Sequence, residues 1–183
     1  MKPSVYLIPG RHDPLDGLLG QSLLDLDQSF WGRELNAPFT ALDFAGQLAA
    51  IHEDLDGCQA RTLIGDSYGA YLLLHALAGR APHPGRVLLF SPVLGEGRAV
   101  SGLYLSRPPR AARLLALAEA GQFPVPAGLQ IHTGEEDPGC DPRLAEHFVA
   151  GLPDAGLWVY PGQGHRLEKT LIRTILADFL AGR

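Results

Sequence analysis

The stretch Thr62-Leu63-Ile64-Gly65-Asp66-Ser67-Tyr68-Gly69 joins an apolar strand to an apolar helix through a turn flanked by glycines. The residues that follow, Tyr68–Ala78, are apolar on nearly every side and predict a buried helix. The pattern Gly-x-Ser-x-Gly between a strand and a helix is typical of a nucleophile elbow, a strained turn that lifts a serine hydroxyl above the edge of a sheet. Side chains at positions 65 and 69 would collide with the neighbouring strand and helix.

Ser67 is therefore the expected nucleophile. By itself the five-residue pattern is a weak signal, and its place between a strand and a helix is what gives it weight. The helix that begins beneath the serine adds to this interpretation, since a helix N-terminus carries partial positive charge where an oxyanion would form. The alternative is an ordinary glycine-rich turn in which Ser67 only caps the helix.

Outward from this stretch, short apolar runs alternate with longer amphipathic ones. Strands that alternate with helices at this spacing predict a parallel sheet with helices on both faces. We expect a single α/β domain over residues 1–183, built on an open, mainly parallel six-stranded sheet, with a short cap-like insertion at about 93–127. The expected strands are Val5–Ile8, Arg61–Ile64, Val87–Phe90, Leu129–His132, Leu157–Tyr160 and a short one near Glu34-Leu35. The expected helices are Leu18–Leu26, Thr40–Asp56, Tyr68–Ala78, Arg110–Ala120, Asp141–Gly151 and Arg166–Ala181.

A serine hydroxyl needs a base to take its proton, and His165 is the best placed of the seven histidines. It ends the loop Pro161-Gly162-Gln163-Gly164-His165, directly after the last expected strand. Loops at the carboxyl ends of parallel strands face the ligand crevice, and Ser67 lies in a loop of the same kind. His12 also follows a strand and is the rival base.

The base in turn needs a carboxylate that fixes its tautomer and stabilises its charged form. The segment Gly134-Glu135-Glu136-Asp137 follows the preceding strand, so it reaches the same edge of the sheet. Asp137 is the expected partner of His165, with Glu135, Glu136 and Asp141 as alternatives. Asp141 already has an explanation, because Asp141-Pro142 is typical of a helix N-cap followed by proline at the first helical position.

Acyl transfer also needs two hydrogen-bond donors aimed at the developing oxyanion. The backbone N–H groups of Tyr68 and Arg11 are the expected donors. Arg11 lies in the loop after the first strand, where Gly10 allows the backbone to approach, and Gly10 and His12 are candidate substrate contacts. The alternative is that Pro9-Gly10 is only a turn.

Four arginines lie in the cap-like insertion, and two of them, Arg110 and Arg113, are candidate contacts for a substrate. The stretch Leu94–Glu119 contains Arg98, Arg107, Arg110 and Arg113 against Glu96 and Glu119, in a chain of net charge −5. A guanidinium suits a carboxylate or phosphate on the substrate. The alternative is that these arginines form the solvated face of a helix whose leucines pack inward.

The elbow, the acidic segment at 134–137, the Gly-x-Gly-His segment at 162–165 and the order Ser67, Asp137, His165 together resemble the α/β-hydrolase superfamily. The resemblance covers nearly the whole chain and suggests a small, minimally capped member without the leading antiparallel hairpin. It implies a serine hydrolase that cleaves a small carboxylic ester and needs no cofactor. Thioesterase, peptidase or acyltransferase activity on the same triad remains open, as does a non-catalytic interaction protein with this fold.

Other classes of protein find little support in the sequence. The net charge of −5 and the lack of a basic tract disfavour nucleic acid or membrane binding. Two distant cysteines without a CxxC pair disfavour a zinc site and suggest a reducing, cytoplasmic location. Gly162-Gln163-Gly164 lacks the third glycine of a dinucleotide-binding motif, and His52-Glu53 lacks the second histidine of a zinc helix.

Overall fold

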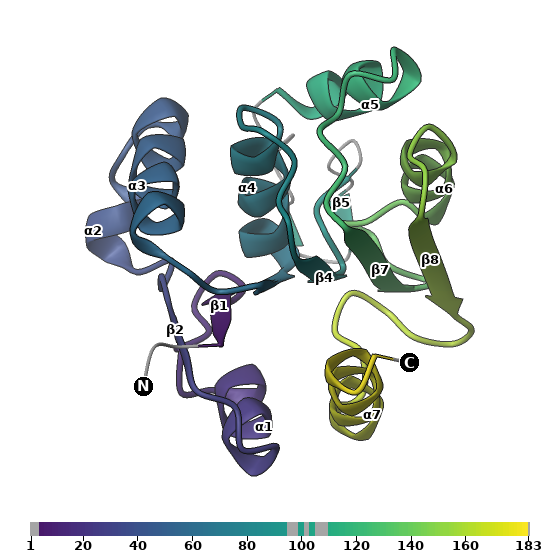
Figure 1. Ribbon diagram of the computed structural model, residues 1–183. Helices are drawn as coiled ribbons and strands as arrows, with labels where there is room; N and C mark the ends of the chain where they lie inside the picture. Colours follow the sequence, from purple (N-terminus) through teal and green to yellow (C-terminus); the bar gives the residue numbers. More distant parts are fainter. Residues whose placement is uncertain (1–3, 95–98, 101–102, 105–109, 183) are drawn as a thin grey trace.

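The computed structural model describes residues 4–94, 99–100, 103–104 and 110–182, and its centre is a six-stranded parallel sheet. The order across the sheet is β2-β1-β3-β4-β7-β8 (Figure 1). The expected α/β class and open six-stranded sheet are therefore confirmed. The strands of the sheet are β1 (Val5–Ile8), β2 (Phe30–Gly32), β3 (Thr62–Asp66), β4 (Arg86–Phe90), β7 (Gly128–Gly134) and β8 (Ala155–Tyr160).

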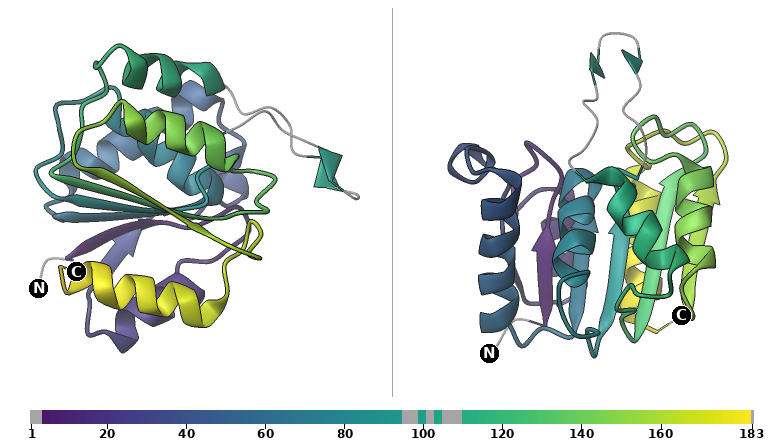
Figure 2. Two further views of the ribbon diagram at one scale, coloured as in Figure 1. Left: turned by 90° about the vertical axis from the view of Figure 1, so that its right-hand side faces the viewer. Right: turned by 90° about the horizontal axis from the view of Figure 1, so that it is seen from above.

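Helices cover both faces of the sheet (Figure 2). On one face lie α1 (Leu18–Asp25) and α7 (Lys169–Leu180), whose apolar residues pack against Val5, Leu7 and the other side chains that point to this side. The other face packs through the alternate strand residues, such as Tyr6 and Ile8. It is covered by α2 (Ala37–Thr40), α3 (Phe44–Gly57), α4 (Ser67–Leu77), α5 (Ala111–Glu119) and α6 (Pro142–Ala150). The central helix α4 is buried along most of its length, as its apolar sequence predicts.

The chain changes direction across the sheet between β1 and β3. From β1 it moves outward to β2, then crosses back to β3 and continues through β4 and β7 to β8. In open α/β sheets such a switch point, at the carboxyl ends of the strands, is where ligands bind. Here it brings the loop after β1 beside the start of α4, where Ser67 lies.

The structure differs from the expectation in two segments, the strand at the β2 edge of the sheet and the helix that follows it. The strand expected near Glu34-Leu35 lies at Phe30–Gly32, whose aromatic side chains suit a strand. The chain has already turned away by Glu34, whose carboxylate accepts a hydrogen bond from the N–H of Leu15 (2.8 Å). Arg33, which directly follows the strand, donates a hydrogen bond to Asp54 of α3 (Nη2 to Oδ1, 2.6 Å).

The helix expected over Thr40–Asp56 begins later, as α3 (Phe44–Gly57), and Thr40 is instead the last residue of the short helix α2. The start of α3 is set by Asp43, which caps it with a carboxylate that accepts the N–H of Gly46 (2.7 Å). An N-cap residue has non-helical backbone angles, so a continuous helix cannot pass through it. The boundaries of the remaining elements lie within three residues of those expected.

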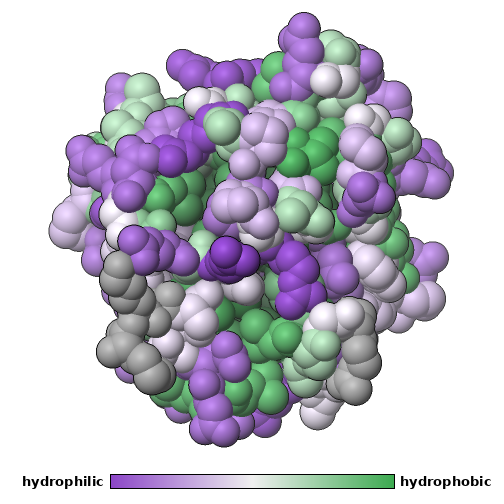
Figure 3. All heavy atoms as spheres, in the orientation of Figure 1, coloured by the Kyte–Doolittle hydropathy of each residue, from purple (hydrophilic) through white to green (hydrophobic). Residues whose placement is uncertain are grey.

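The segment expected to form an insertion, at about 93–127, contains a small antiparallel hairpin, β5 (Ala99–Val100) and β6 (Leu103–Tyr104). The hairpin projects from the end of the molecule where the strands of the main sheet terminate (Figure 2). Figure 3 shows the opposite end, on which the strands begin, and hydrophilic side chains gather across the middle of that face. No helix among the described residues is long and apolar enough to cross a membrane.

Candidate active site

Ser67 stands on a strained turn between β3 and α4. Its φ angle of 52° lies in the left-handed region, which a serine rarely adopts. The two flanking glycines make the turn possible. A Cβ atom at Gly65 would lie 2.6 Å from Cα of Ala70, and one at Gly69 would lie 2.4 Å from the carbonyl oxygen of Pro9. The collisions expected at positions 65 and 69 are therefore confirmed. The two glycines allow β1, β3 and α4 to pack closely around the serine.

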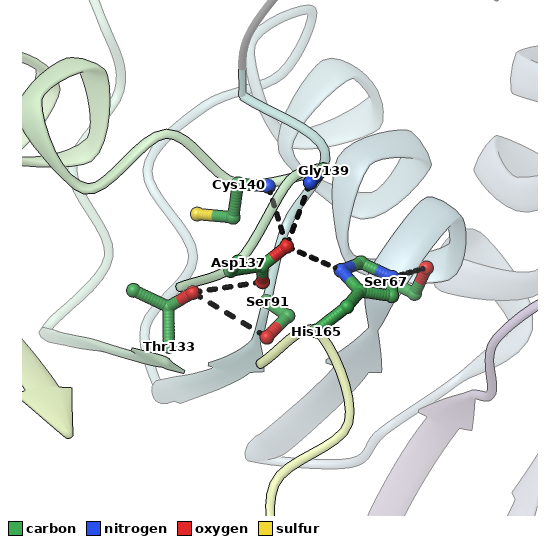
Figure 4. Close-up of polar contacts among 7 residues, drawn as sticks. All are labelled: Ser67, Ser91, Thr133, Asp137, Gly139, Cys140 and His165. Atoms are coloured by element: carbon green, nitrogen blue, oxygen red, sulfur yellow. Dashed lines mark hydrogen bonds and ion pairs between the residues drawn. The ribbon is translucent and has the colours of Figure 1, made fainter. Parts of the chain in front are cut away.

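A continuous chain of hydrogen bonds connects Ser67, His165 and Asp137 (Figure 4). Oγ of Ser67 lies 2.7 Å from Nε2 of His165, and Nδ1 of the same imidazole lies 2.7 Å from Oδ1 of Asp137. The ionised carboxylate is an acceptor only, so Nδ1 bears the proton and Nε2 is free to accept the serine proton. The three residues come from the loops after β3, β8 and β7.

Backbone contacts hold the acid loop against the base loop. The N–H of Glu136 donates to the carbonyl oxygen of Gln163 (3.0 Å), and the side chain of Gln163 accepts the N–H of Glu168 (2.9 Å). Gly134 allows this close approach, because a Cβ atom there would lie 2.1 Å from the same carbonyl oxygen. The loops that present Asp137 and His165 are thus fixed relative to each other.

The electrostatics of the pair favour an ionised acid and a basic imidazole. Burial alone would raise the pKa of Asp137, but hydrogen bonds from His165, the Cys140 N–H and Ser91 outweigh it and lower the pKa. Burial alone would lower the pKa of His165, but the hydrogen bond and charge of Asp137, with the charge of Asp66, outweigh it and raise the pKa. The imidazole is thereby prepared to take up a proton.

Several solved structures have the same arrangement of elements, and each can be superposed on nearly the whole of this chain. A protein from Xanthomonas campestris assigned to the α/β-hydrolase superfamily matches with a TM-score of 0.68 and 17% identity, over 100% of both chains. Est1E from Butyrivibrio proteoclasticus matches with a TM-score of 0.73 and 13% identity, over 99% of this chain and 88% of its own. The monoacylglycerol lipase of Paleococcus ferrophilus has a TM-score of 0.66 and 16% identity, over 99% of this chain and 96% of its own.

The protein has the α/β-hydrolase fold. At the level of sequence, neither a family model nor a curated protein matches the chain. The likeness therefore lies in the three-dimensional arrangement of the elements.

In this α/β-hydrolase fold, the loop after β1 meets the elbow where the second oxyanion donor was expected. A Cβ atom at Gly10 would lie 3.5 Å from Cβ of Ser67, so the backbone of this loop passes directly beside the nucleophile. The guanidinium of Arg11 stacks over the ring of Tyr68, 4.1 Å from its centroid. No hydrogen bond between described residues is donated by the N–H of Arg11. The two expected donors thus belong to neighbouring segments whose side chains are in contact.

A second carboxyl group lies beside the nucleophile. Asp66 is partly buried, and burial, helped by the charges of Asp13 and Asp137, raises its pKa to about 6 against the opposing charges of His165 and Arg166. Arg166 also forms an ion pair with Asp13, at 3.5 Å. The negative charge of Asp66 contributes to the raised pKa of His165.

The remaining candidate residues lie farther from the reacting groups. His12 is exposed, with a φ of 68°, and no hydrogen bond joins it to Ser67 among the described residues. Arg110 stacks over Phe44 (5.6 Å), and the charges of Arg110 and Arg113 act on His75. His75 is eight positions beyond Ser67 on α4, about 12 Å along the helix axis. Arg98 and Arg107 are outside the described residues.

The alternatives to Asp137 have other positions. Glu135 and Glu136 are exposed, and the carboxylate of Asp141 accepts the N–H of Arg143 (3.0 Å) as the N-cap of α6. No sequence motif selects Ser91 or Thr133, two buried hydroxyl residues behind Asp137. The only signal for them is position, since each stands at the carboxyl end of a strand next to the acid loop.

Proposed function

We propose that this protein is a serine hydrolase that cleaves a small carboxylic ester through an acyl-enzyme formed on Ser67. The observation that carries the proposal is the chain of two 2.7 Å contacts from Ser67 through His165 to Asp137, built on an elbow whose glycines admit no side chain. A buried, ionised acid behind an imidazole beside a strained serine is the arrangement that activates a hydroxyl.

In the acylation half-reaction, Oγ of Ser67 attacks the ester carbonyl while Nε2 of His165 takes its proton. The carbonyl oxygen becomes an oxyanion, which the N–H groups of Tyr68 and Arg11 stabilise together with the N-terminus of α4. Collapse of this intermediate breaks the ester C–O bond. His165 returns the proton to the leaving alcohol, and the acyl group stays on Ser67.

In the deacylation half-reaction, His165 removes a proton from water, whose oxygen attacks the acyl carbon. The second tetrahedral intermediate collapses to the free acid, and the proton returns to Oγ of Ser67. Asp137 stays ionised throughout and stabilises the imidazolium that forms twice in each cycle. Catalysis therefore depends on a carboxylate that cannot move or take up a proton.

The choice of an ester follows from the superfamily resemblance, and the same machinery accepts related acyl compounds. The test is a panel of a small activated ester, the matching thioester and an aminoacyl arylamide, assayed with wild type and with Ser67→Ala. We expect the ester to be the best substrate and Ser67→Ala to lower its turnover by about a million-fold. If Ser67→Ala keeps more than a tenth of the ester activity, the proposed function is wrong. If the thioester or arylamide is the best substrate, the triad stands and the substrate class changes.

A further inference from the structure

Behind the triad, Asp137 is held by more than its histidine. Its Oδ1 oxygen accepts three hydrogen bonds, from Nδ1 of His165 (2.7 Å), the N–H of Gly139 (2.7 Å) and the N–H of Cys140 (2.9 Å). Its Oδ2 oxygen accepts the hydroxyl of Thr133 at 3.0 Å, and Oγ of Ser91 lies 3.4 Å from that hydroxyl (Figure 4). Among these contacts, the backbone N–H groups donate only to Oδ1. Oδ2, which faces away from His165, is therefore held by side chains alone.

The direction of each hydroxyl proton follows from the acceptor. A carboxylate oxygen cannot donate, so Thr133 gives its single hydroxyl proton to Oδ2. In the contact between the two hydroxyls, Ser91 must then be the donor and Thr133 the acceptor. The side chain of Ser91 is also among the groups that lower the pKa of Asp137. The two hydroxyls therefore form a short, oriented chain that ends on the acid.

The fold places these hydroxyls with precision. Phe90 of β4 pairs with His132 of β7, so Ser91 and Thr133 are the next residues of two neighbouring strands. The N–H of Ser91 donates to the carbonyl oxygen of His132 (2.8 Å), which fixes the backbone there. Ser91 is buried and has a φ of 43°, in the left-handed region. A glycine would fit this backbone with less strain, and strain of this kind is typical of functional positions.

We propose that Ser91 and Thr133 are a hydroxyl pair that positions Asp137 and keeps it ionised, and that they act on the reaction only through His165. This inference rests on the proposed function and names two further residues on which the triad depends. Both are positioning residues, because neither reaches the reacting atoms. Without the pair, the carboxylate would have one unsatisfied oxygen in a buried site and would gain freedom to rotate away from the imidazole.

The consequence for His165 has a definite sign. Asp137 raises the pKa of His165 by stabilising the protonated ring. A carboxylate that is displaced or partly protonated stabilises the imidazolium less, so the pKa of His165 falls. The acid limb of the kcat/KM profile then moves to lower pH, while the plateau rate falls because the imidazolium in the transition state has lost support. A change that merely unfolds part of the protein moves neither the limb nor the histidine pKa.

The test compares Thr133→Val, which keeps the shape and removes the hydroxyl, with Thr133→Ser, which keeps the hydroxyl. We expect Thr133→Val to lower kcat by about 10-fold to 100-fold, the loss seen when an outer hydrogen-bond partner of a ligating histidine is removed. KM should be unchanged, and the His165 pKa, followed by NMR titration, should fall. Thr133→Ser should stay within about threefold of wild type in kcat, since the hydrogen bond to Oδ2 remains.

Ser91→Gly separates positioning from stability at the other hydroxyl. It should lower kcat and the His165 pKa while leaving Tm equal or higher, because glycine relieves the left-handed strain. The matched control is Ser22→Ala, which removes a buried hydroxyl that donates to the Leu18 carbonyl oxygen (2.6 Å) in α1, far from the acid. This control should change neither kcat nor the histidine pKa.

The proposal is overturned if Thr133→Val keeps the wild-type kcat and His165 pKa, or if Thr133→Ser is as impaired as Thr133→Val. It is also overturned if Ser91→Gly loses activity only in proportion to folded protein. The NMR titration needs no substrate, so it tests the hydroxyl pair even if the ester assay rejects the proposed function.

Discussion

Asp137 and Asp141 stand four residues apart and have different tasks. Asp137 is buried and bonded to His165, whereas Asp141 caps α6 through the N–H of Arg143. The sequence limits the candidates for the carboxylate partner of His165 to four residues, which all follow the same strand. It separates them only in part, since the choice depends on the path of the loop between the strand and α6. That path is set by contacts distant in sequence, such as the one between Glu136 and Gln163.

Exchanging each aspartate for asparagine tests the two assignments. Asp137→Asn should lower kcat by about four orders of magnitude, since an amide stabilises the wrong histidine tautomer. Asp141→Asn should leave kcat near wild type and change the free energy of unfolding by about 1 kcal/mol or less, because asparagine also caps helices. Both kcat and Tm are measured for the two variants. A larger catalytic loss at position 141 than at position 137 contradicts the assignment.

The hydroxyl pair shows where sequence reasoning at the level of residues ends. Serine and threonine are common residues, so Ser91 and Thr133 match no motif. Their role depends on the register that places Phe90 beside His132, and the register emerges only when the strands pair. Ser67 and His165 could be found earlier because glycine-containing loops surround both of them.

At the scale of elements, the alternation of apolar runs and amphipathic stretches was sufficient to predict the central strands and most helices. It misplaced β2, where a three-residue strand leaves too short a pattern to recognise. It also began the helix α3 at Thr40 rather than at Phe44, because the spacing of apolar residues alone does not reveal the Asp43 cap. The nucleophile elbow could be predicted because its steric demands are local, and the collisions at Gly65 and Gly69 show how little space remains.

Gly69→Ala tests the packing of the elbow against β1. The added Cβ would lie 2.4 Å from the Pro9 oxygen and 2.5 Å from the Ile8 oxygen, so the end of β1 must move. We expect the free energy of unfolding to fall by about 1–3 kcal/mol, as in other overpacked sites. Ester turnover should also fall, because the Gly10 loop moves with the strand. Denaturant unfolding and kcat/KM provide the measurements.

Gly57→Ala is the matched control for that substitution. No atom of the described residues lies within 4 Å of a Cβ atom placed at Gly57, at the end of α3. The helix preference of alanine should leave the free energy of unfolding unchanged or raise it by up to about 1 kcal/mol, with unaltered activity. If Gly69→Ala is as stable and active as Gly57→Ala, the elbow does not depend on a glycine at position 69.

At the scale of the whole molecule, the helices on the side of the sheet that α3 and α4 cover enclose His75. His75 is buried against Phe44 and Tyr71, and neither ring nitrogen has a hydrogen-bond partner among the described residues. Burial, helped by the charges of Arg113 and Arg110, lowers its pKa to about 4. His75 is enclosed because α4 is buried over residues 68–77.

This histidine makes stability depend on pH. Between about pH 6.5 and pH 4 the unfolded chain binds a proton at position 75 and the folded protein does not, so stability falls as the pH falls, by about 1.4 kcal/mol per pH unit. His132, whose pKa burial also lowers to about 4, acts in the same direction, and the raised pKa of Asp66 acts in the opposite one.

His75→Leu should therefore lose less stability than wild type between pH 7 and pH 5, by about 2 kcal/mol. Leucine fills a similar volume and brings no unpaired polar atom. The measurement is denaturant unfolding at both pH values, with His147→Gln as the control, because the side chain of His147 is exposed. Equal losses in wild type and His75→Leu would show that His75 is protonated to the same extent in the folded and unfolded protein.

The proposed function requires Ser67 to be a nucleophile activated by His165 and Asp137. The most direct test is reaction of the folded protein with a fluorophosphonate, followed by intact mass and peptide mapping. We expect a single adduct on Oγ of Ser67 in wild type, much slower labelling of His165→Ala, and none of Ser67→Ala. An adduct on another residue, or no adduct on folded wild-type protein, would contradict it.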